Sequence, residues 1–547
     1  MVIIIMARSI RLAALSKTAA TLTQSRRAAR KISSGVVSGR RTSTMHLPSK
    51  CAPSADFRLQ RAQRFFSTEP IEWKESNISA DALPDGSAVV VSFTQGESLF
   101  HAPWLWCNDP SYIHPSSGQR MHSPSSFFGW KIASANVVSK DHPEQGHAHA
   151  VRPIPPPPLG CLHPVGCVYK STTDHGASDM PMLCVSWVRN DESFVSYYDT
   201  SWLKACRYDA DALRDHREQT EITSERALRH DSTLFSIGYE QVIADQDSDD
   251  ARFALLHAVL RDGAALVINT PSDDTEPASP VASLGCALAG SLSHGHLYGD
   301  TFHVKTSSNA NNIAYTSVPL PPHQDLAYYQ SAPGLQLLHC VNNRGVRGGE
   351  STLIDAVAAA NEFRRLAPDL FQALATCEAT FIKQREGADM VYFRPHIHDS
   401  NGNVTSVHWS PPFEGPLKIA ADDLEGYYVA YAAFESMLDN SLPPNVHLPI
   451  SDALREALRG YANKYTWEQQ LQPGEALVFN NQRMLHGRRG FALEGDAKAP
   501  GDRHLAGCYT NMEETLSEYR LLRRERLRSA GKVMPVPNAG NGSSGSI

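Results

Sequence analysis

A histidine and an aspartate two residues apart, His323 and Asp325, are well suited by type and spacing to hold a metal ion. They lie in "VPLPPHQDLAYYQSAPGLQLLHC", just before an apolar stretch that predicts a buried strand. On an extended strand the side chains at i and i+2 point the same way, so this imidazole and this carboxylate can converge on one point. A third ligand would complete one triangular face around the ion.

His486 is the candidate for the third ligand, because it follows a predicted strand, "EALVF", and a turn, "NNQRML". Two histidines and one carboxylate on one face match the ligand set of non-haem Fe(II) oxygenases, which leaves positions free for a cosubstrate and oxygen. The chain has 23 histidines, and a His-x-Asp pair often arises by chance. The pair gains weight because Arg503 follows His486, and a forked guanidinium is suited to grip a dicarboxylate.

Short β-rich runs separated by glycine and proline dominate the first half of the chain. Over residues 83–205, "SAVVVSF" and "PMLCVSW" predict strands of a small N-terminal β domain. The proline-rich "VRPIPPPPLGCLHPVGC" between them predicts a surface loop in extended polyproline form.

A larger unit is predicted over residues 230–530, beginning near "STLFSIGYEQ". Within it "DARFALLHAVLRDGAALVINT" predicts a helix, a glycine stop and a buried strand. The unit ends in "ETLSEYRLLRRERLRSA", which predicts a charged amphipathic helix, and residues 531–547 predict a disordered tail.

The first 66 residues have the composition of a mitochondrial targeting segment. The first acidic residue is Asp56, and ten lysines and arginines precede it among many Ala, Ser, Thr and Leu residues. The alternative is a disordered basic arm that binds nucleic acid or lipid. No apolar run reaches the roughly 18 residues of a membrane-spanning helix, so we expect a soluble protein of the mitochondrial matrix without a membrane partner.

The charge of the remaining chain bears on its partners. Residues 1–64 carry thirteen basic side chains and one acid, a net +12, so the overall −7 becomes −19 without them. An acidic body argues against a nucleic-acid partner. The ten cysteines are scattered without a CxxC pair, which favours ordinary thiols in a reducing compartment.

Five motifs, in this order, resemble the γ-butyrobetaine and trimethyllysine dioxygenases, which belong with taurine dioxygenase: "ANNIAYTSVPLPPHQD", "PGLQLLHCVNN", "GGESTLIDA", "FNNQRMLHGRRGF" and "DRHLAGCY". The resemblance extends from about Ser87 to Leu522 and is strong from Tyr298 onward. It implies a mainly β fold with helices, in which a double-stranded β-helix (cupin-like jelly roll) forms the catalytic domain beside a small N-terminal β domain. It also implies Fe(II), 2-oxoglutarate and O2, with ascorbate as a reductant, and a homodimer.

Transferred position by position, the resemblance makes His323, Asp325 and His486 the iron ligands. Arg503 matches the arginine that binds 2-oxoglutarate. Two further positions match residues beside the cosubstrate, where Ser351 touches it and Leu338 packs against it.

The resemblance also implies a cage of aromatic rings for a quaternary ammonium, which is held by ring faces because it cannot donate a hydrogen bond. The matching residues are Tyr298, Phe302, Tyr315 and Tyr509. Phe302 stands where γ-butyrobetaine enzymes tend to have tryptophan, and a phenyl face attracts a cation less strongly than an indole face.

Asn312 matches the asparagine that meets the substrate carboxylate. A neutral amide suits γ-butyrobetaine, whereas the α-ammonium of trimethyllysine would favour an acidic partner. By contrast, "HWSPPFEGPL" departs from the family's asparagine-containing segment, and proline has no N–H to donate. The first reading is therefore hydroxylation of γ-butyrobetaine to L-carnitine; trimethyllysine, another betaine, and a non-catalytic betaine-binding protein stay open.

The N-terminal domain departs from the family's zinc site, which has three clustered cysteines and a later histidine. Here "WLWCNDPSYIHPSSGQR" retains only Cys107, and Glu192 stands where the histidine would be. One thiolate and scattered oxygens make a poor zinc site, so we expect none in this domain.

Overall fold

The computed structural model describes residues 78–529, except 95, 113–119, 140–180, 213–226, 245–247, 273–278, 294–296, 307–312, 386, 401, 441–447 and 494–502. The targeting segment, the proline-rich loop, Asn312 and the C-terminal tail lie outside the described residues, so the predictions made for them stay predictions.

In the described residues of the N-terminal β domain, the structure has two three-stranded antiparallel sheets and two short α-helices. The strand predictions at "SAVVVSF" and "PMLCVSW" are confirmed as β2 and β5. The sheets are β1 (Ser79–Ala82), β2 (Ala88–Phe93) and β3 (Gly96–His101), and β4 (Lys131–Val138), β5 (Met182–Arg189) and β6 (Glu192–Asp199), with helices α3 (Ala102–Cys107) and α4 (Thr200–Ala205).

Indole rings form the centre of this domain's core. Trp106 stacks on Trp130 with ring centroids 5.2 Å apart and meets Trp187 edge-on at 5.5 Å. The buried indole N–H of Trp187 donates to Ser196 Oγ at 2.8 Å, so this polar atom is not left unpaired in the apolar core. Glu192 binds Arg189, and Cys107 is half-buried at the end of α3; the expectation of no zinc stays a prediction.

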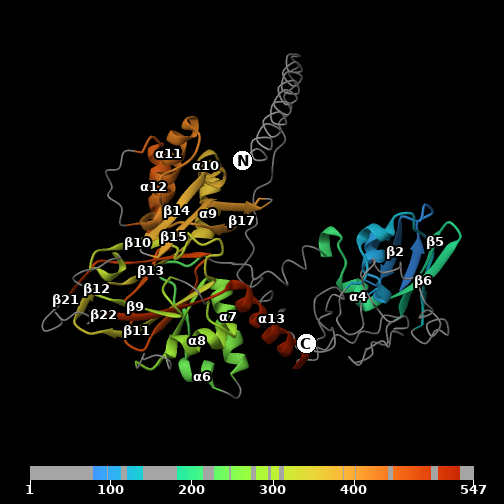
Figure 1. The fold of residues 1–547 in the computed structure, drawn as a ribbon, viewed down its shortest axis with the longest axis horizontal. Coiled ribbons are helices and arrows are strands. Elements are labelled where there is room, and N and C mark those ends of the chain that lie inside the picture. Colours follow the sequence, from blue (N-terminus) through green and yellow to red (C-terminus); the bar gives the residue numbers. More distant parts are fainter. Residues whose placement is uncertain are drawn as a thin grey trace, which may run out of the picture. The chain divides into compact units, whose positions relative to one another are not determined.

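The larger domain, predicted from the sequence to be catalytic, is a double-stranded β-helix built from two facing sheets, as predicted (Figure 1). The six-stranded sheet has the order β7 (Phe235–Gly238), β8 (Ala264–Ile268), β19 (Ala476–Asn480), β11 (Leu335–Asn343), β22 (Arg503–Thr510) and β9 (Thr301–Lys305). The four-stranded sheet has the order β10 (Leu320–His323), β20 (Met484–Arg488), β13 (Ser351–Asp355) and β18 (Trp467–Gln469). All neighbours are antiparallel except β7 and β8.

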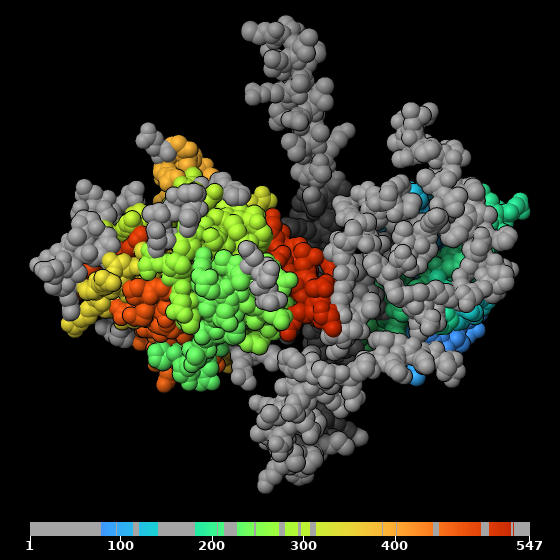
Figure 2. Space-filling model, turned by 90° about the horizontal axis from the view of Figure 1, so that it is seen from below, coloured from blue at the N-terminus to red at the C-terminus, as the bar shows by residue number. Residues whose placement is uncertain are grey.

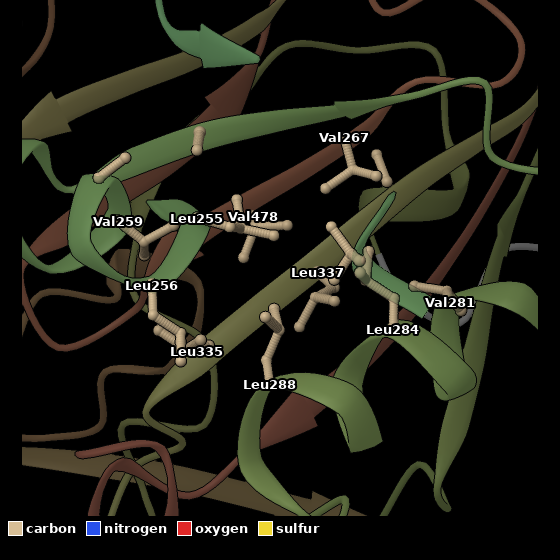
Figure 3. Close-up of a cluster of buried hydrophobic side chains, with 14 of the residues drawn as sticks. Leu255, Leu256, Val259, Val267, Val281, Leu284, Leu288, Leu335, Leu337 and Val478 are labelled. Atoms are coloured by element: carbon tan, nitrogen blue, oxygen red, sulfur yellow. The ribbon is translucent and has the colours of Figure 1, made fainter. Parts of the chain in front are cut away.

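Helices cover the outer face of the six-stranded sheet: α6 (Tyr239–Ile243), α7 (Asp249–Asp262), α8 (Pro280–Ala289) and α13 (Met512–Ser529). Leucines of α7 and α8 meet Leu335 and Leu337 of the sheet (Figure 3). Each fully buried leucine of this kind contributes roughly 2 kcal/mol relative to an exposed one. In Figure 2 the red surface of α13 adjoins the green surface of the segment that includes α7.

Gly263 ends α7 in the left-handed conformation, with φ 91°, and β8 begins at the next residue. An added Cβ there would lie 2.4 Å from Met484 Sδ, so glycine is required both by conformation and by space. The predicted order of helix, glycine stop and buried strand is thus confirmed, as is the C-terminal helix.

A helical insertion with its own core lies between β13 and β18, drawn in yellow and orange in Figure 1. It contains α9 (Ala356–Leu366), α10 (Pro368–Thr376), α11 (Ala421–Leu438), α12 (Asp452–Tyr465) and the hairpins β14 (Glu378–Arg385) with β15 (Ala388–Pro395) and β16 (Ile397–Ser400) with β17 (Asn403–Val407). Three smaller elements complete the described part of this domain. They are η4 (Ile313–Tyr315), η5 (Pro411–Phe413) and the pair β12 (Val346–Gly348) with β21 (Phe491–Leu493). Among the described helices, none combines the length and the apolar character needed to cross a membrane.

Candidate metal centre and substrate pocket

Strand pairing places two of the predicted metal ligands opposite each other. His323, the last residue of β10, pairs with His486 in the middle of β20, and their ring centroids are 4.2 Å apart. Asp325 lies beside both: its Oδ1 is 3.4 Å from His323 Nε2, and its Oδ2 is 3.8 Å from His486 Nε2. One potential ligand atom from each residue lies within 4.8 Å of the others, so the structure brings all three together.

Asp325 reaches this point by a turn, so the prediction that it continues the strand of His323 is wrong. β10 ends at His323, and Leu326 has a positive φ of 56°. Asn481 holds the turn, because its side chain accepts from Asp325 N–H at 3.1 Å and donates to Asp325 C=O at 3.2 Å. The carboxylate is therefore positioned by a residue 156 positions away rather than by strand alternation.

The turn before His486 is fastened by a buried ion pair. Arg483 donates to Asp355 Oδ2 at 2.6 and 2.9 Å and also to the C=O of Arg261 at 2.8 Å. Asp355 caps α9 through Ala358 N–H at 2.9 Å, so one carboxylate joins the end of β13 to the start of β20. The predicted strand before His486 is confirmed as β19, but the predicted turn is shorter than expected, because Met484 and Leu485 already belong to β20.

Two side chains orient the Asp325 carboxylate. Gln336 Nε2 and the Tyr509 hydroxyl each donate to Oδ2 at 2.7 Å, and Oδ1 is left facing His323. Burial alone would raise the pKa of Asp325, but the two imidazoles and the Tyr509 hydroxyl hold it below its ordinary value. Asp325 is therefore ionised at neutral pH, as a metal ligand must be.

The protonation of the imidazoles also suits a cation. His323 Nδ1 lies 2.9 Å from the C=O of Pro321, and a carbonyl can only accept, so Nδ1 is the donor of this bond and Nε2 is left facing Asp325. Burial lowers the pKa of His486 to about 3, which keeps that ring neutral. Two imidazole nitrogens and one carboxylate oxygen on one side form a donor set that fits Fe(II).

The cluster opens onto a cavity that contains all the other predicted site residues in the described part of the chain. These are Tyr298, Phe302, Tyr315, Leu338, Ser351, Arg503 and Tyr509. The cavity also contains residues that sequence reasoning missed: Gln336, Tyr328, Phe413 and Arg488. A signal for Gln336 was present, because a lone amide inside the apolar "LQLLH" must find a buried partner.

Arg503 enters the cavity from the start of β22. Its side chain is 5% exposed, and its guanidinium lies 5.3 Å from the Phe491 ring. Burial lowers its pKa to about 10, so it is still a cation at neutral pH. Within the described residues its guanidinium has no hydrogen-bond acceptor or ion-pair partner, and a buried cation of that kind is a ready site for a carboxylate.

Arg488 has the opposite role, although it lines the same cavity. It donates to the C=O groups of Ala314, Thr316 and Val318 at 3.0, 2.8 and 2.6 Å. These bonds fasten the segment that carries Tyr315, so this arginine is structural.

Two of the aromatic rings pack against each other. Phe302 and Tyr509 stack with centroids 4.9 Å apart, and the Tyr509 hydroxyl is bound to Asp325. Phe302 is seated against Gly507, where a Cβ would lie 2.3 Å from its Cζ. Tyr509 thus joins the aromatic side of the cavity to the metal ligands, a link that the sequence did not indicate.

Comparison with known proteins gives one family match. The family described as "Taurine catabolism dioxygenase TauD, TfdA family" matches residues 231–509. This range contains every described site residue.

Curated relatives include a γ-butyrobetaine dioxygenase of Pseudomonas sp. (strain AK-1), 30% identical over 343 residues that cover 62% of this chain and 79% of the relative. The dioxygenase str8 of Strobilurus tenacellus is 28% identical over 62% of this chain and 74% of its own length. The mitochondrial trimethyllysine dioxygenase of Mus musculus is 25% identical over 63% and 73%. Among solved structures, a taurine dioxygenase from Burkholderia xenovorans aligns with 52% of this chain and 90% of its own, at 14% identity and a TM-score of 0.32.

Proposed function

The chain belongs to the TauD/TfdA family of dioxygenases, and from that membership we propose that it hydroxylates a small quaternary-ammonium compound, with γ-butyrobetaine as substrate and L-carnitine as product. One observation carries the proposal: a single cavity holds the His, Asp, His cluster, a buried arginine without a partner in the described residues, and a group of aromatic rings.

The protein is a 2-oxoglutarate-dependent dioxygenase that uses Fe(II), 2-oxoglutarate and O2. Because the chain belongs to a family of enzymes, we reject the alternative of a non-catalytic betaine-binding protein. When bound, the ferrous ion supplies the redox chemistry that couples decarboxylation of 2-oxoglutarate to hydroxylation of an unactivated carbon.

We assign the roles of the side chains as follows. His323, Asp325 and His486 hold the iron, and Arg503 binds the far carboxylate of 2-oxoglutarate, beside Ser351 and Leu338. The protein need not supply a strong base, because its contribution is to orient two small molecules and to exclude water.

The aromatic rings support a quaternary-ammonium substrate. Tyr298, Phe302 and Tyr315 line the cavity, and a ring face attracts a cation by about 0.5–2 kcal/mol depending on its exposure to water. Phenylalanine at position 302 is the weakest of these, so we expect a looser grip than an indole would give. The ring of Tyr509 adds bulk, while its hydroxyl serves Asp325.

Trimethyllysine is the second candidate, and the similarity to a mitochondrial trimethyllysine dioxygenase of Mus musculus favours it. Its α-ammonium would need an acidic partner. Among the described residues that line the cavity, the acid is Asp325, which we assign to the metal. This charge balance supports γ-butyrobetaine. The matrix location, the homodimer and the lack of nucleic-acid and membrane partners stay predictions from the sequence.

Succinate release by the full chain, supplied with Fe(II), 2-oxoglutarate and one quaternary amine at a time, tests the proposal. We expect coupled release with γ-butyrobetaine and formation of L-carnitine, identified by mass spectrometry. Release with trimethyllysine but not with γ-butyrobetaine would reverse the assignment. The His486→Ala variant serves as the control for release that does not depend on the metal site.

A further inference from the structure

One face of the hairpin strand β14 lies beside residues that line the substrate cavity, although Lys383, which is half-buried, and Arg385, which is exposed, are not themselves part of that lining. Phe381, Lys383 and Arg385 alternate along β14, so their side chains share one face. Phe381 is fully buried in a cluster with Tyr328 and Tyr509, two residues that line the cavity. The two cations that follow Phe381 therefore extend along the same side.

Each of these cations lies over a ring of the cavity wall. Lys383 Nζ is 4.9 Å from the ring centroid of Phe413, and Arg385 Cζ is 5.6 Å from that of Tyr298. Arg385 also donates one N–H to the C=O of Leu297, the residue before Tyr298. The contacts place positive charge beside two rings of the cavity lining, of which Tyr298 belongs to the predicted aromatic cage.

No acid in the described residues neutralises this pair. The residues opposite on β15 are Met390 and Ala388, which are uncharged. Asp389 pairs across the hairpin with Gln384, on the other face. Glu414, which follows Phe413, is hydrogen-bonded to Tyr431 instead.

From this geometry we propose that Lys383 and Arg385 form an anion site that binds the carboxylate of the substrate. The inference rests on the proposed function and adds two charged groups at the carboxylate end of the substrate, where the resemblance had indicated only the neutral amide of Asn312. A carboxylate between the two cations would offset their mutual repulsion and accept charge-assisted hydrogen bonds from both. A zwitterionic betaine then binds with its carboxylate toward β14 and its ammonium toward the remaining rings.

The surroundings of Lys383 agree with this role. Burial, followed by the charge of Arg385, lowers the pKa of Lys383, so its ammonium lacks a compensating anion. The facing segment η5 provides few hydrogen-bond donors for a carboxylate, because Pro411 and Pro412 have no N–H to donate.

The test compares γ-butyrobetaine with its carboxamide, which keeps the trimethylammonium and loses the negative charge. We expect Lys383→Met and Arg385→Gln each to raise KM for γ-butyrobetaine roughly tenfold. KM for the carboxamide and for 2-oxoglutarate should change less than about twofold. Arg385→Lys, which keeps the charge, should restore part of the loss.

Lys418→Met is the matched control. Lys418 Nζ lies 5.0 Å from the ring of Phe393, a contact like that of Lys383, but Phe393 is not part of the described cavity wall. This variant should leave all three KM values unchanged. Equal changes for the acid and the amide, or no change for either, would overturn the proposal.

Calorimetric binding separates failure of the anion site from failure of the proposed function. γ-Butyrobetaine and pentanoate, which lacks the ammonium, are titrated into the full chain and into the Lys383→Met/Arg385→Gln double variant. If no quaternary amine is turned over but carboxylate binding is lost in the double variant, the proposed function fails and the anion site stands. If γ-butyrobetaine is turned over with an unchanged KM, or neither carboxylate binds the unaltered protein, the anion site is wrong.

Discussion

The two ends of the cavity differ in how far their polar groups are already paired. At the metal end, Asp325 accepts from Gln336 and Tyr509, and His323 donates to the C=O of Pro321. On the side of β14, Lys383 lies over an aromatic ring, and within the described residues it has no hydrogen-bond acceptor or ion-pair partner. The metal end is organised before any ligand arrives, whereas the substrate side has charges that a ligand must complete.

The difference separates what is general from what is particular to this chain. A fixed His, Asp, His cluster suits any reaction of the family, because it sets ligand geometry and nothing about the substrate. Unpaired cations and aromatic rings favour those small molecules whose charges are arranged to match them. Substitutions should therefore act on catalysis at one end and on substrate choice at the other.

Replacing His486 by alanine should have the largest effect. Loss of one of the three proposed metal ligands should lower kcat by roughly a thousandfold or more, because the iron carries the chemistry. Binding of γ-butyrobetaine, measured by calorimetry, should change only a few-fold, since the rings and the β14 cations are untouched. Retained turnover, or a loss of substrate binding as large as the loss of turnover, would abolish the contrast between the two ends.

Arg503→Met should have the next largest effect, on the cosubstrate. A buried bidentate ion pair with 2-oxoglutarate is worth about 1.5–3 kcal/mol, which corresponds to a rise in KM for 2-oxoglutarate of roughly 10–100-fold. Arg489→Met is the control, because Arg489 is already paired with Glu468. The assignment fails if the two variants have the same KM for 2-oxoglutarate.

Tyr509→Phe should have a smaller effect and decides to which end Tyr509 belongs. The substitution keeps the ring and removes the hydroxyl that donates to Asp325. We expect Fe(II) to bind about tenfold more weakly, as is usual when a partner of a metal ligand is lost. KM for γ-butyrobetaine should stay within about twofold. A shift in that KM without a change in Fe(II) affinity would place the hydroxyl among the substrate contacts instead.

Local patterns in the sequence predicted much of the metal end. Apolar runs and a glycine stop located β19 and the α7–β8 unit, and residue type, spacing and the family resemblance together selected His323, Asp325 and His486. The turn that positions Asp325 could not be predicted from such patterns. Its position depends on a turn held by Asn481, a long-range contact that leaves no periodic signal.

The substrate side was harder to predict, because it is built from segments distant in sequence. Lys383 and Arg385 read as ordinary surface charges until the hairpin β14–β15 is placed beside Tyr298 and Phe413. The helical insertion that carries this hairpin was not anticipated. The dual role of Tyr509 also depends on the pairing of β22 with β11, which brings Tyr509 opposite Gln336.

Anaerobic titration of the full chain with Fe(II), followed by 2-oxoglutarate, tests the central claim most directly. We predict one Fe(II) per chain and a visible charge-transfer band when 2-oxoglutarate is added, and both should be lost in the His486→Ala variant. Fe(II) binding of undiminished affinity in that variant would contradict the account, because the iron would then be held elsewhere.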